Sequence, residues 1–132
     1  MALRDPLVVD ASALVDALTT TTPGTRVVER LRDHRLHAPA HLDAEVLSAL
    51  ARLPRAGTLT DRQVANRVRQ MAAATITRHA VGPLLAGSWR RRHNVRMVDA
   101  LYVELSHQLG GVPLVTTDAR LAAIVPNAEV VS

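Results

Sequence analysis

The chain has 132 residues, 48% of them apolar and none of them Phe, which is enough for one compact domain spanning residues 1–132 with an aliphatic core. All 16 basic residues are Arg, and the net charge of +4 suits a partner that carries phosphates. Cys is absent, which excludes disulfides and thiolate metal sites. No signal peptide or membrane-spanning stretch is visible, so we expect a cytoplasmic protein with no membrane partner.

Short apolar strands alternate with helices along the whole sequence. The strands are predicted at residues 7–9, 36–38, 75–78, 114–116 and 129–131. The helices are predicted at residues 12–18, 26–32, 42–56, 60–74, 83–93, 98–109 and 119–124, with a break at 19–24. The clearest signal for the start of a helix is the capping box from Thr60 to Gln63. This alternation predicts an α/β fold, a three-layer α/β/α sandwich with a mostly parallel sheet of about five short strands.

Four acidic residues occupy similar places relative to these elements. Asp10 and Asp118 each follow a strand, at the edge where such sheets bind ligands. Glu45 and Asp99 lie near the starts of two helices. Carboxylates that share a site repel one another, and a hard cation such as Mg²⁺ or Mn²⁺ relieves that repulsion. In an Arg-rich chain, the pattern indicates metal-dependent phosphodiester chemistry on nucleic acid.

Each acid also has an ordinary structural explanation. Asp10 fits an ordinary turn in which Ser12 is the N-cap, Asp99 fits a first-turn acid that complements the helix dipole, and Asp118 fits an N-cap for the short helix that follows. Glu45 lies beside the apolar stripe of its helix, but Asp43 projects at least as far inward. Periodicity alone does not choose between these two residues.

Other polar residues are expected to have no catalytic role. His34, His37 and His41 have a spacing that imitates a metal site, but Pro39 prevents His37 and His41 from sharing a helix face. We therefore expect surface or hydrogen-bonded histidines rather than a zinc site. Glu104 is expected to be a solvated surface acid.

Four segments of the chain resemble the PIN-domain family, specifically the VapC-type toxin ribonucleases. They occur in the family's order at residues 8–15 (VVDASALV), 39–50 (PAHLDAEVLSAL), 99–105 (DALYVEL) and 113–121 (PLVTTDARL). The resemblance implies an acidic catalytic set with two supporting hydroxyls: Asp10, Glu45, Asp99 and Asp118, supported by Ser12 and Thr116. It thereby prefers Glu45 to Asp43. One departure is Arg96-Met97-Val98, where many relatives have Thr-Ala-Tyr.

The resemblance further implies an endoribonuclease that acts as the toxin of a type II toxin–antitoxin pair. Mg²⁺ or Mn²⁺ would be held by Asp10, Asp99 and Asp118, while Glu45 orients water or binds a second metal. The implied partners are RNA, a VapB-type antitoxin and a second copy in a homodimer, with operator DNA contacted only through the antitoxin. The Arg residues expected to steer the RNA backbone are Arg90, Arg91, Arg92 and Arg96.

Two other functions remain open. One is a PIN-fold nuclease with a housekeeping role in RNA processing or DNA cleavage. The other is a catalytically idle PIN scaffold that binds RNA or protein. The complete set of four acids argues against the scaffold, because a binding protein has no need of a costly anionic cluster. The cluster at residues 90–92 is equally consistent with a solvated helix end.

Overall fold

The computed structural model describes residues 2–132 and contains a five-stranded sheet in which all paired neighbours are parallel. The strands are β1 (Arg4–Val9), β2 (His34–Pro39), β3 (Ile76–His79), β4 (Leu114–Thr116) and β5 (Ala128–Val130). The helices are α1 (Ala11–Leu18), α2 (Thr22–Leu31), α3 (Leu42–Ala51), α4 (Asp61–Ala73), α5 (Leu85–Arg90), α6 (Met97–Gln108) and α7 (Ala119–Ile124), with a 3₁₀ turn η1 (Gly82–Leu84) before α5.

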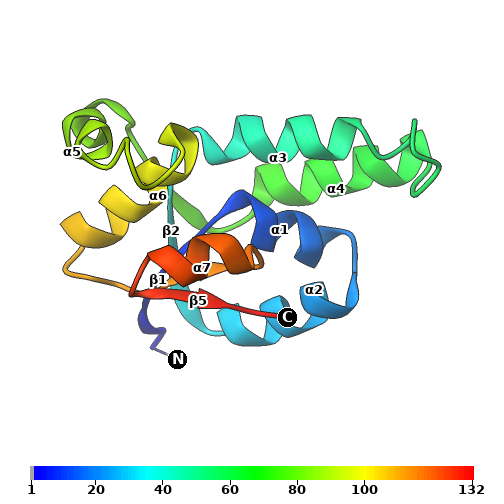
Figure 1. Ribbon diagram of the computed structural model, residues 1–132. Coiled ribbons are helices and arrows are strands. Elements are labelled where there is room, and N and C mark those ends of the chain that lie inside the picture. The colour runs from blue at the N-terminus through cyan, green and yellow to red at the C-terminus, as the bar shows by residue number, and fades with distance from the viewer. Residues whose placement is uncertain (1) are drawn as a thin grey trace.

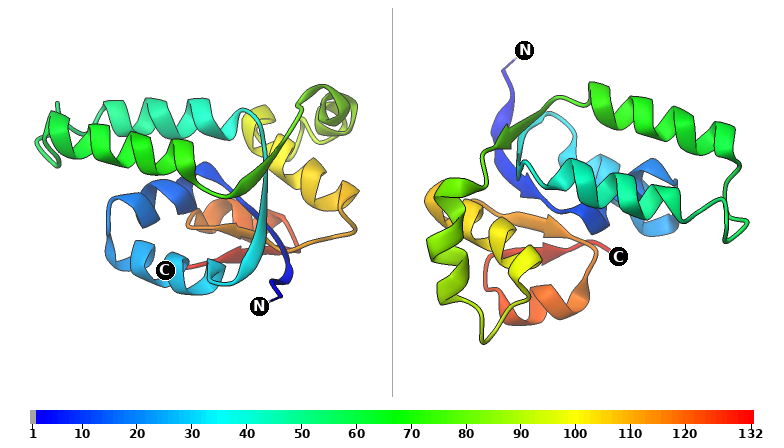
Figure 2. Two further views of the ribbon diagram at one scale, coloured as in Figure 1. Left: turned by 180° about the vertical axis from the view of Figure 1, so that it is seen from behind. Right: turned by 90° about the horizontal axis from the view of Figure 1, so that it is seen from above.

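The order of the strands, β3-β2-β1-β4-β5, divides the helices into two layers. The chain first moves from β1 through β2 to β3, and then crosses back to β4 and β5 on the other side of β1. Because crossovers between parallel strands are right-handed, α1–α4 cover one face and α5–α7 cover the other. In agreement, α3 and α4 lie side by side, and α5 packs on α6 (Figures 1 and 2). The predicted three-layer α/β/α sandwich is confirmed.

The core is centred on β1 and β4. Leu7, Val8 and Val9 are buried, as are Leu114 and Val115 on the neighbouring strand. Strands covered on both faces require such continuous apolar runs. In residues 2–132, no helix combines the length and apolar character needed to cross a bilayer.

Local signals placed most elements correctly, and the exceptions have physical reasons. The predicted break at 19–24 is wrong in its second half, since α2 begins at Thr22 with Pro23 in its first turn. Proline is tolerated there because the backbone N–H groups of the first turn make no hydrogen bond within the helix. The helix predicted over 42–56 ends at Ala51, because Pro54 disfavours helical geometry in the residue before it. The capping box at Thr60 is present, with reciprocal bonds of 3.2 and 2.8 Å.

The expectation that Glu104 is solvated was wrong, because α5 covers it. Its side chain is buried, with Oε1 2.5 Å from Nη1 of Arg91 and Oε2 3.2 Å from Nε2 of Gln108. Burial acts to raise the pKa of Glu104, but these hydrogen bonds outweigh it and hold the pKa below its ordinary value. Gly87 lets α5 approach so closely, since a Cβ there would lie 2.1 Å from Cδ of Glu104.

Candidate active site

The candidate site lies where the topology reverses direction, between β1 and β4. From these adjacent strands the chain departs toward opposite helix layers, which opens a crevice at their carboxyl ends. Asp10 directly follows β1 and caps α1, and Asp118 follows β4 and caps α7. The two acids therefore reach one edge of the sheet, as the sequence predicted.

A chain of hydrogen bonds links these two strand ends. Oδ1 of Asp10 accepts from the backbone N–H of Ala13 at 3.0 Å and from the hydroxyl of Ser12 at 2.7 Å. The Ser12 hydroxyl lies 3.2 Å from Oγ1 of Thr116, which accepts from the backbone N–H of Asp118 at 3.0 Å. Ser12 and Thr116 thus lie between the two acids and fix their relative positions.

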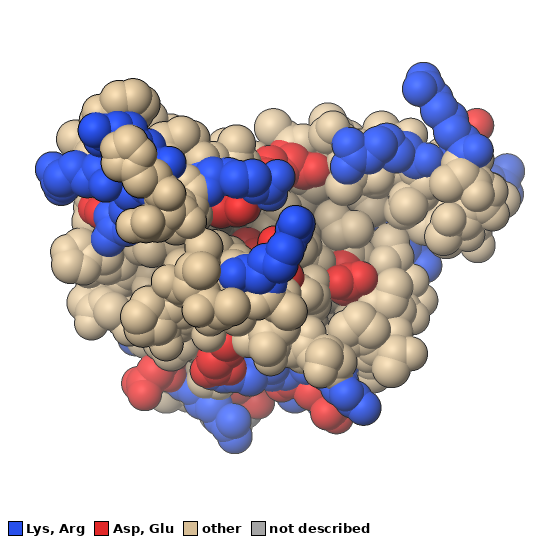
Figure 3. Space-filling view, viewed as in Figure 1, with Lys and Arg blue, Asp and Glu red and all other residues tan. Residues whose placement is uncertain are grey.

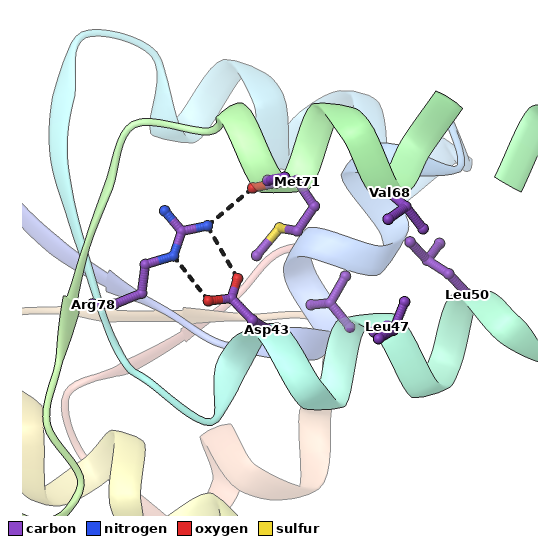
Figure 4. Close-up of a pocket in the computed structure, with 8 residues that line it drawn as sticks. Asp43, Leu47, Leu50, Val68, Met71 and Arg78 are labelled. Atoms are coloured by element: carbon purple, nitrogen blue, oxygen red, sulfur yellow. Dashed lines mark hydrogen bonds and ion pairs between the residues drawn. The ribbon is translucent and has the colours of Figure 1, made fainter. Parts of the chain in front are cut away.

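Glu45 and Asp43 line different pockets, and Asp43 is paired with an arginine from a distant part of the chain. Arg78 on β3 binds Asp43 through a two-point ion pair, with distances of 3.1 Å and 3.0 Å. This pair borders an apolar hollow between α3 and α4 (Figure 4), and Glu45 is not among the residues that line it. Glu45 instead lines the crevice with Asp10. The structure therefore places Glu45, and not Asp43, with the other acids.

Two side chains that were not expected in the site hold Glu45 in place. Tyr102 on α6 donates its hydroxyl to Oε1 of Glu45 at 2.6 Å, and Nε2 of His41 lies 3.1 Å from the same oxygen. Burial acts to raise the pKa of Glu45, but the hydrogen bonds from His41 and Tyr102 outweigh it, so the carboxylate is favoured. Tyr102 follows Asp99 by three residues, a helical spacing that could have indicated its place in the site.

Asp99 completes the set from the second helix layer. It lies in the first turn of α6, and its Oδ2 accepts from Nε of Arg96 at 3.0 Å. All four predicted acids line a single pocket of about 380 Å³, together with Ser12, Tyr102, Arg52 and Arg96. Figure 3 shows acidic side chains in this hollowed face between α3 and α7, with basic side chains around them.

The arginines predicted to steer RNA are not equally placed. Arg96 lines the pocket, but Arg91 is bound to Glu104, and Arg92 lies 4.5 Å above the ring of Trp89. The cations missed by sequence reasoning are Arg52, in the same pocket, and Arg120, whose Nε is 3.8 Å from Asp118. No spacing in the sequence distinguished these two from other surface arginines.

The negative charge of Asp10 is poorly compensated in this pocket. Burial raises the pKa of Asp10, which is 5% exposed, and the Asp99 carboxylate raises it further. Oxygen donors short of counter-charge are suited to a hard divalent cation. In each acid, the hydrogen bonds end on one oxygen: Oδ1 of Asp10, Oε1 of Glu45, Oδ2 of Asp99 and Oδ1 of Asp118.

The pocket is not a closed metal cage in this conformation. Within residues 2–132, no three His, Asp or Glu side chains stand close enough together to hold one ion. Mutual repulsion keeps uncompensated carboxylates apart, so binding a cation requires their side chains to close in. The donor chemistry of the carboxylates that line this hollow fits Mg²⁺ or Mn²⁺.

Comparisons with known proteins agree with this architecture. The family model described as PIN domain matches residues 7–125. Ribonuclease VapC3 of Mycobacterium tuberculosis is 48% identical over 128 residues, covering 96% of this chain and 93% of the relative.

Two solved structures share the fold. PAE2754 from Pyrobaculum aerophilum has a TM-score of 0.67 at 21% identity, over 97% of this chain and 83% of that one. A toxin–antitoxin complex from Klebsiella pneumoniae contains a chain with a TM-score of 0.60 at 15% identity, over 93% of this chain and 95% of that one. The protein described here belongs to the PIN-domain family, and within it to the VapC group.

Proposed function

We propose that this chain is a metal-dependent endoribonuclease that acts as the toxin of a toxin–antitoxin pair. The observation that carries the proposal is that a single pocket is lined by four acids, which come from two strand ends and from both helix layers: Asp10, Glu45, Asp99 and Asp118. The relative named Ribonuclease VapC3 supports RNA as the substrate class.

Each acid has a proposed role that follows from its surroundings. Asp10, Asp99 and Asp118 would hold Mg²⁺ or Mn²⁺, which when bound lowers the pKa of a water ligand and offsets charge on the scissile phosphate. Glu45, held by Tyr102, orients the attacking water or contributes to a second metal. Ser12 and Thr116 keep the Asp10 carboxylate in place.

The RNA backbone would be held by the arginines that surround the acids. Arg52 and Arg96 line the pocket, and Arg96 and Arg120 line an adjoining hollow that also contains Asp99 and Asp118. Guanidinium groups bind phosphate oxygens in a two-point geometry. We therefore place the phosphate contacts at Arg52, Arg96 and Arg120.

A VapB-type antitoxin is the proposed protein partner. The VapC relatives support it, as does the fold neighbour solved within a toxin–antitoxin complex. Homodimer formation and operator binding through the antitoxin stay predictions. The partner is tested by expressing the chain with the small protein encoded beside it and asking whether both elute together. A chain that elutes alone, and is harmless when expressed alone, would contradict a toxin role.

The nuclease activity is tested with matched RNA and DNA oligonucleotides in Mn²⁺, Mg²⁺ and EDTA. We expect RNA cleavage that EDTA stops and added Mn²⁺ restores. Asp99→Asn should abolish cleavage, with an unchanged circular dichroism spectrum. Glu45→Gln should lower it strongly, whereas Asp43→Asn on the same helix should stay active. A fully active Asp99→Asn protein, or equal cleavage of DNA, would contradict the proposal.

A further inference from the structure

Arg96 already occupies part of the acid pocket. Its Nε lies 3.0 Å from Oδ2 of Asp99, whose side chain is 18% exposed, whereas the Arg96 side chain is 76% exposed. The hydrogen bond that Arg96 donates to Asp99 raises the pKa of Arg96, and the charges of Asp118 and Glu45 raise it further. One guanidinium group therefore experiences the field of three of the four proposed catalytic acids.

The position of Arg96 in its helix gives no reason for an arginine. Arg96 is the N-cap residue of α6 and makes no side-chain capping bond. Helix N-caps favour Ser, Thr, Asp or Asn, whose side-chain oxygens accept from the first free N–H groups. A guanidinium group has no acceptor and is also a cation near the positive end of the helix dipole. The benefit of Arg96 must therefore come from the pocket that it faces.

We infer that Arg96 is the resident counter-ion of the acid pocket, which a divalent cation must displace from Asp99 before the catalytic acids can close around it. This inference rests on the proposed metal-dependent function. In the metal-free protein, Arg96 offsets part of the repulsion among the four carboxylates. Since Arg96 is largely exposed, it can leave Asp99 without disturbing the core.

The same side chain is then positioned to meet the substrate. Arg96 lines both the acid pocket and the adjoining hollow, where Asn94 and Arg120 also lie. An RNA strand that crosses the acids passes Arg96 on its way from one hollow to the other. Arg96 therefore exchanges a carboxylate partner for a phosphate when metal and RNA bind, and its removal should affect these two ligands in opposite directions.

The test compares Arg96→Gln with Arg62→Gln, an equal loss of charge in the first turn of α4. Gln is chosen because Thr would add an N-cap and stabilise α6 for an unrelated reason. By Mn²⁺ titration calorimetry at low ionic strength, Arg96→Gln should bind the ion roughly five- to tenfold more tightly than the unaltered chain. Its melting temperature in EDTA should fall, its Mn²⁺-induced rise should be larger, and its KM for RNA should increase.

The outcomes separate this inference from the function on which it rests. If the unaltered chain binds no Mn²⁺, the metal-dependent function fails and the counter-ion role fails with it. If the unaltered chain binds Mn²⁺ and Arg96→Gln binds it equally or more weakly, only the counter-ion role is overturned. The gain in Mn²⁺ affinity should shrink as salt is raised, because salt screens exposed charges. A gain that is independent of salt, or equal in Arg62→Gln, would also overturn it.

Discussion

Tyr102 and Glu45 connect the two helix layers across the acid pocket, through a hydrogen bond of 2.6 Å between the phenolic hydroxyl and Oε1. Tyr102 is 1% exposed, and its ring lies 4.8 Å from the imidazole of His41. Burial and the adjacent Glu45 carboxylate raise the pKa of Tyr102, so its hydroxyl remains a donor at any physiological pH. The orientation of Glu45 therefore depends on a residue from the opposite layer.

Replacing Tyr102 with Phe removes this donor while keeping the buried ring. We expect kcat for RNA cleavage to fall about tenfold, the effect of losing about 1.4 kcal/mol of barrier lowering. We expect the free energy of unfolding to fall by about 1–2 kcal/mol, because the charged Glu45 carboxylate loses the hydrogen bond from the Tyr102 hydroxyl. Single-turnover kinetics and urea unfolding measure the two effects. A change in KM alone would show that Tyr102 does not position Glu45.

Asp10→Asn should stabilise the metal-free protein while abolishing cleavage. Since burial raises the pKa of Asp10, the ionised form is disfavoured in the folded state. The resulting penalty is present above the folded pKa and disappears as pH falls through it. Asn can still accept the bonds from Ser12 and Ala13 without carrying charge.

Melting in EDTA as a function of pH measures this effect of Asp10. The Asn variant should melt higher at neutral pH, and its advantage should shrink as the solution is acidified. A variant that melts lower at neutral pH would show that the Asp10 charge is compensated in the fold.

Combined replacement of Arg52 and Arg120 by Gln should weaken RNA binding and reduce its salt dependence. Each lost phosphate contact lowers the slope of log K against log[salt] by about 0.7 for a single strand. The measurement uses the inactive Asp99→Asn background, so that RNA stays intact. Arg90→Gln is the control, because Arg90 lies on α5 and does not line the pocket. An equal loss of RNA affinity in the control would contradict our placement of the phosphate contacts.

Gly87→Ala should destabilise the protein by about 1–3 kcal/mol, because its new methyl group would collide with the buried Glu104 carboxylate. Gly82→Ala is the matched control, since nothing lies within 4 Å of a Cβ at that position. Thermal or urea unfolding of the two variants measures the difference. Equal stability would show that α5 can move away from α6 at no cost.

The sequence by itself determined the layers and the edge of the sheet where Asp10 and Asp118 lie. Both follow from local physics, because strands and helices alternate and each acid stands beside a strand end. The capping box at Thr60 is equally local, since its two bonds join residues three positions apart. Such features depend on backbone geometry that near neighbours fix.

Only the tertiary structure decided which charged residues share a pocket. Periodicity leaves Glu45 and Asp43 nearly equivalent, and only the family resemblance preferred Glu45. In the structure, the two differ because Arg78, 35 positions away from Asp43, pairs with Asp43. The sequence indicated that Glu104 is solvated, but in the structure α5 covers it and Arg91, 13 positions away, pairs with it. Ion-pair partners come from distant segments that meet when the layers pack, and helical periodicity carries no information about which segments will meet.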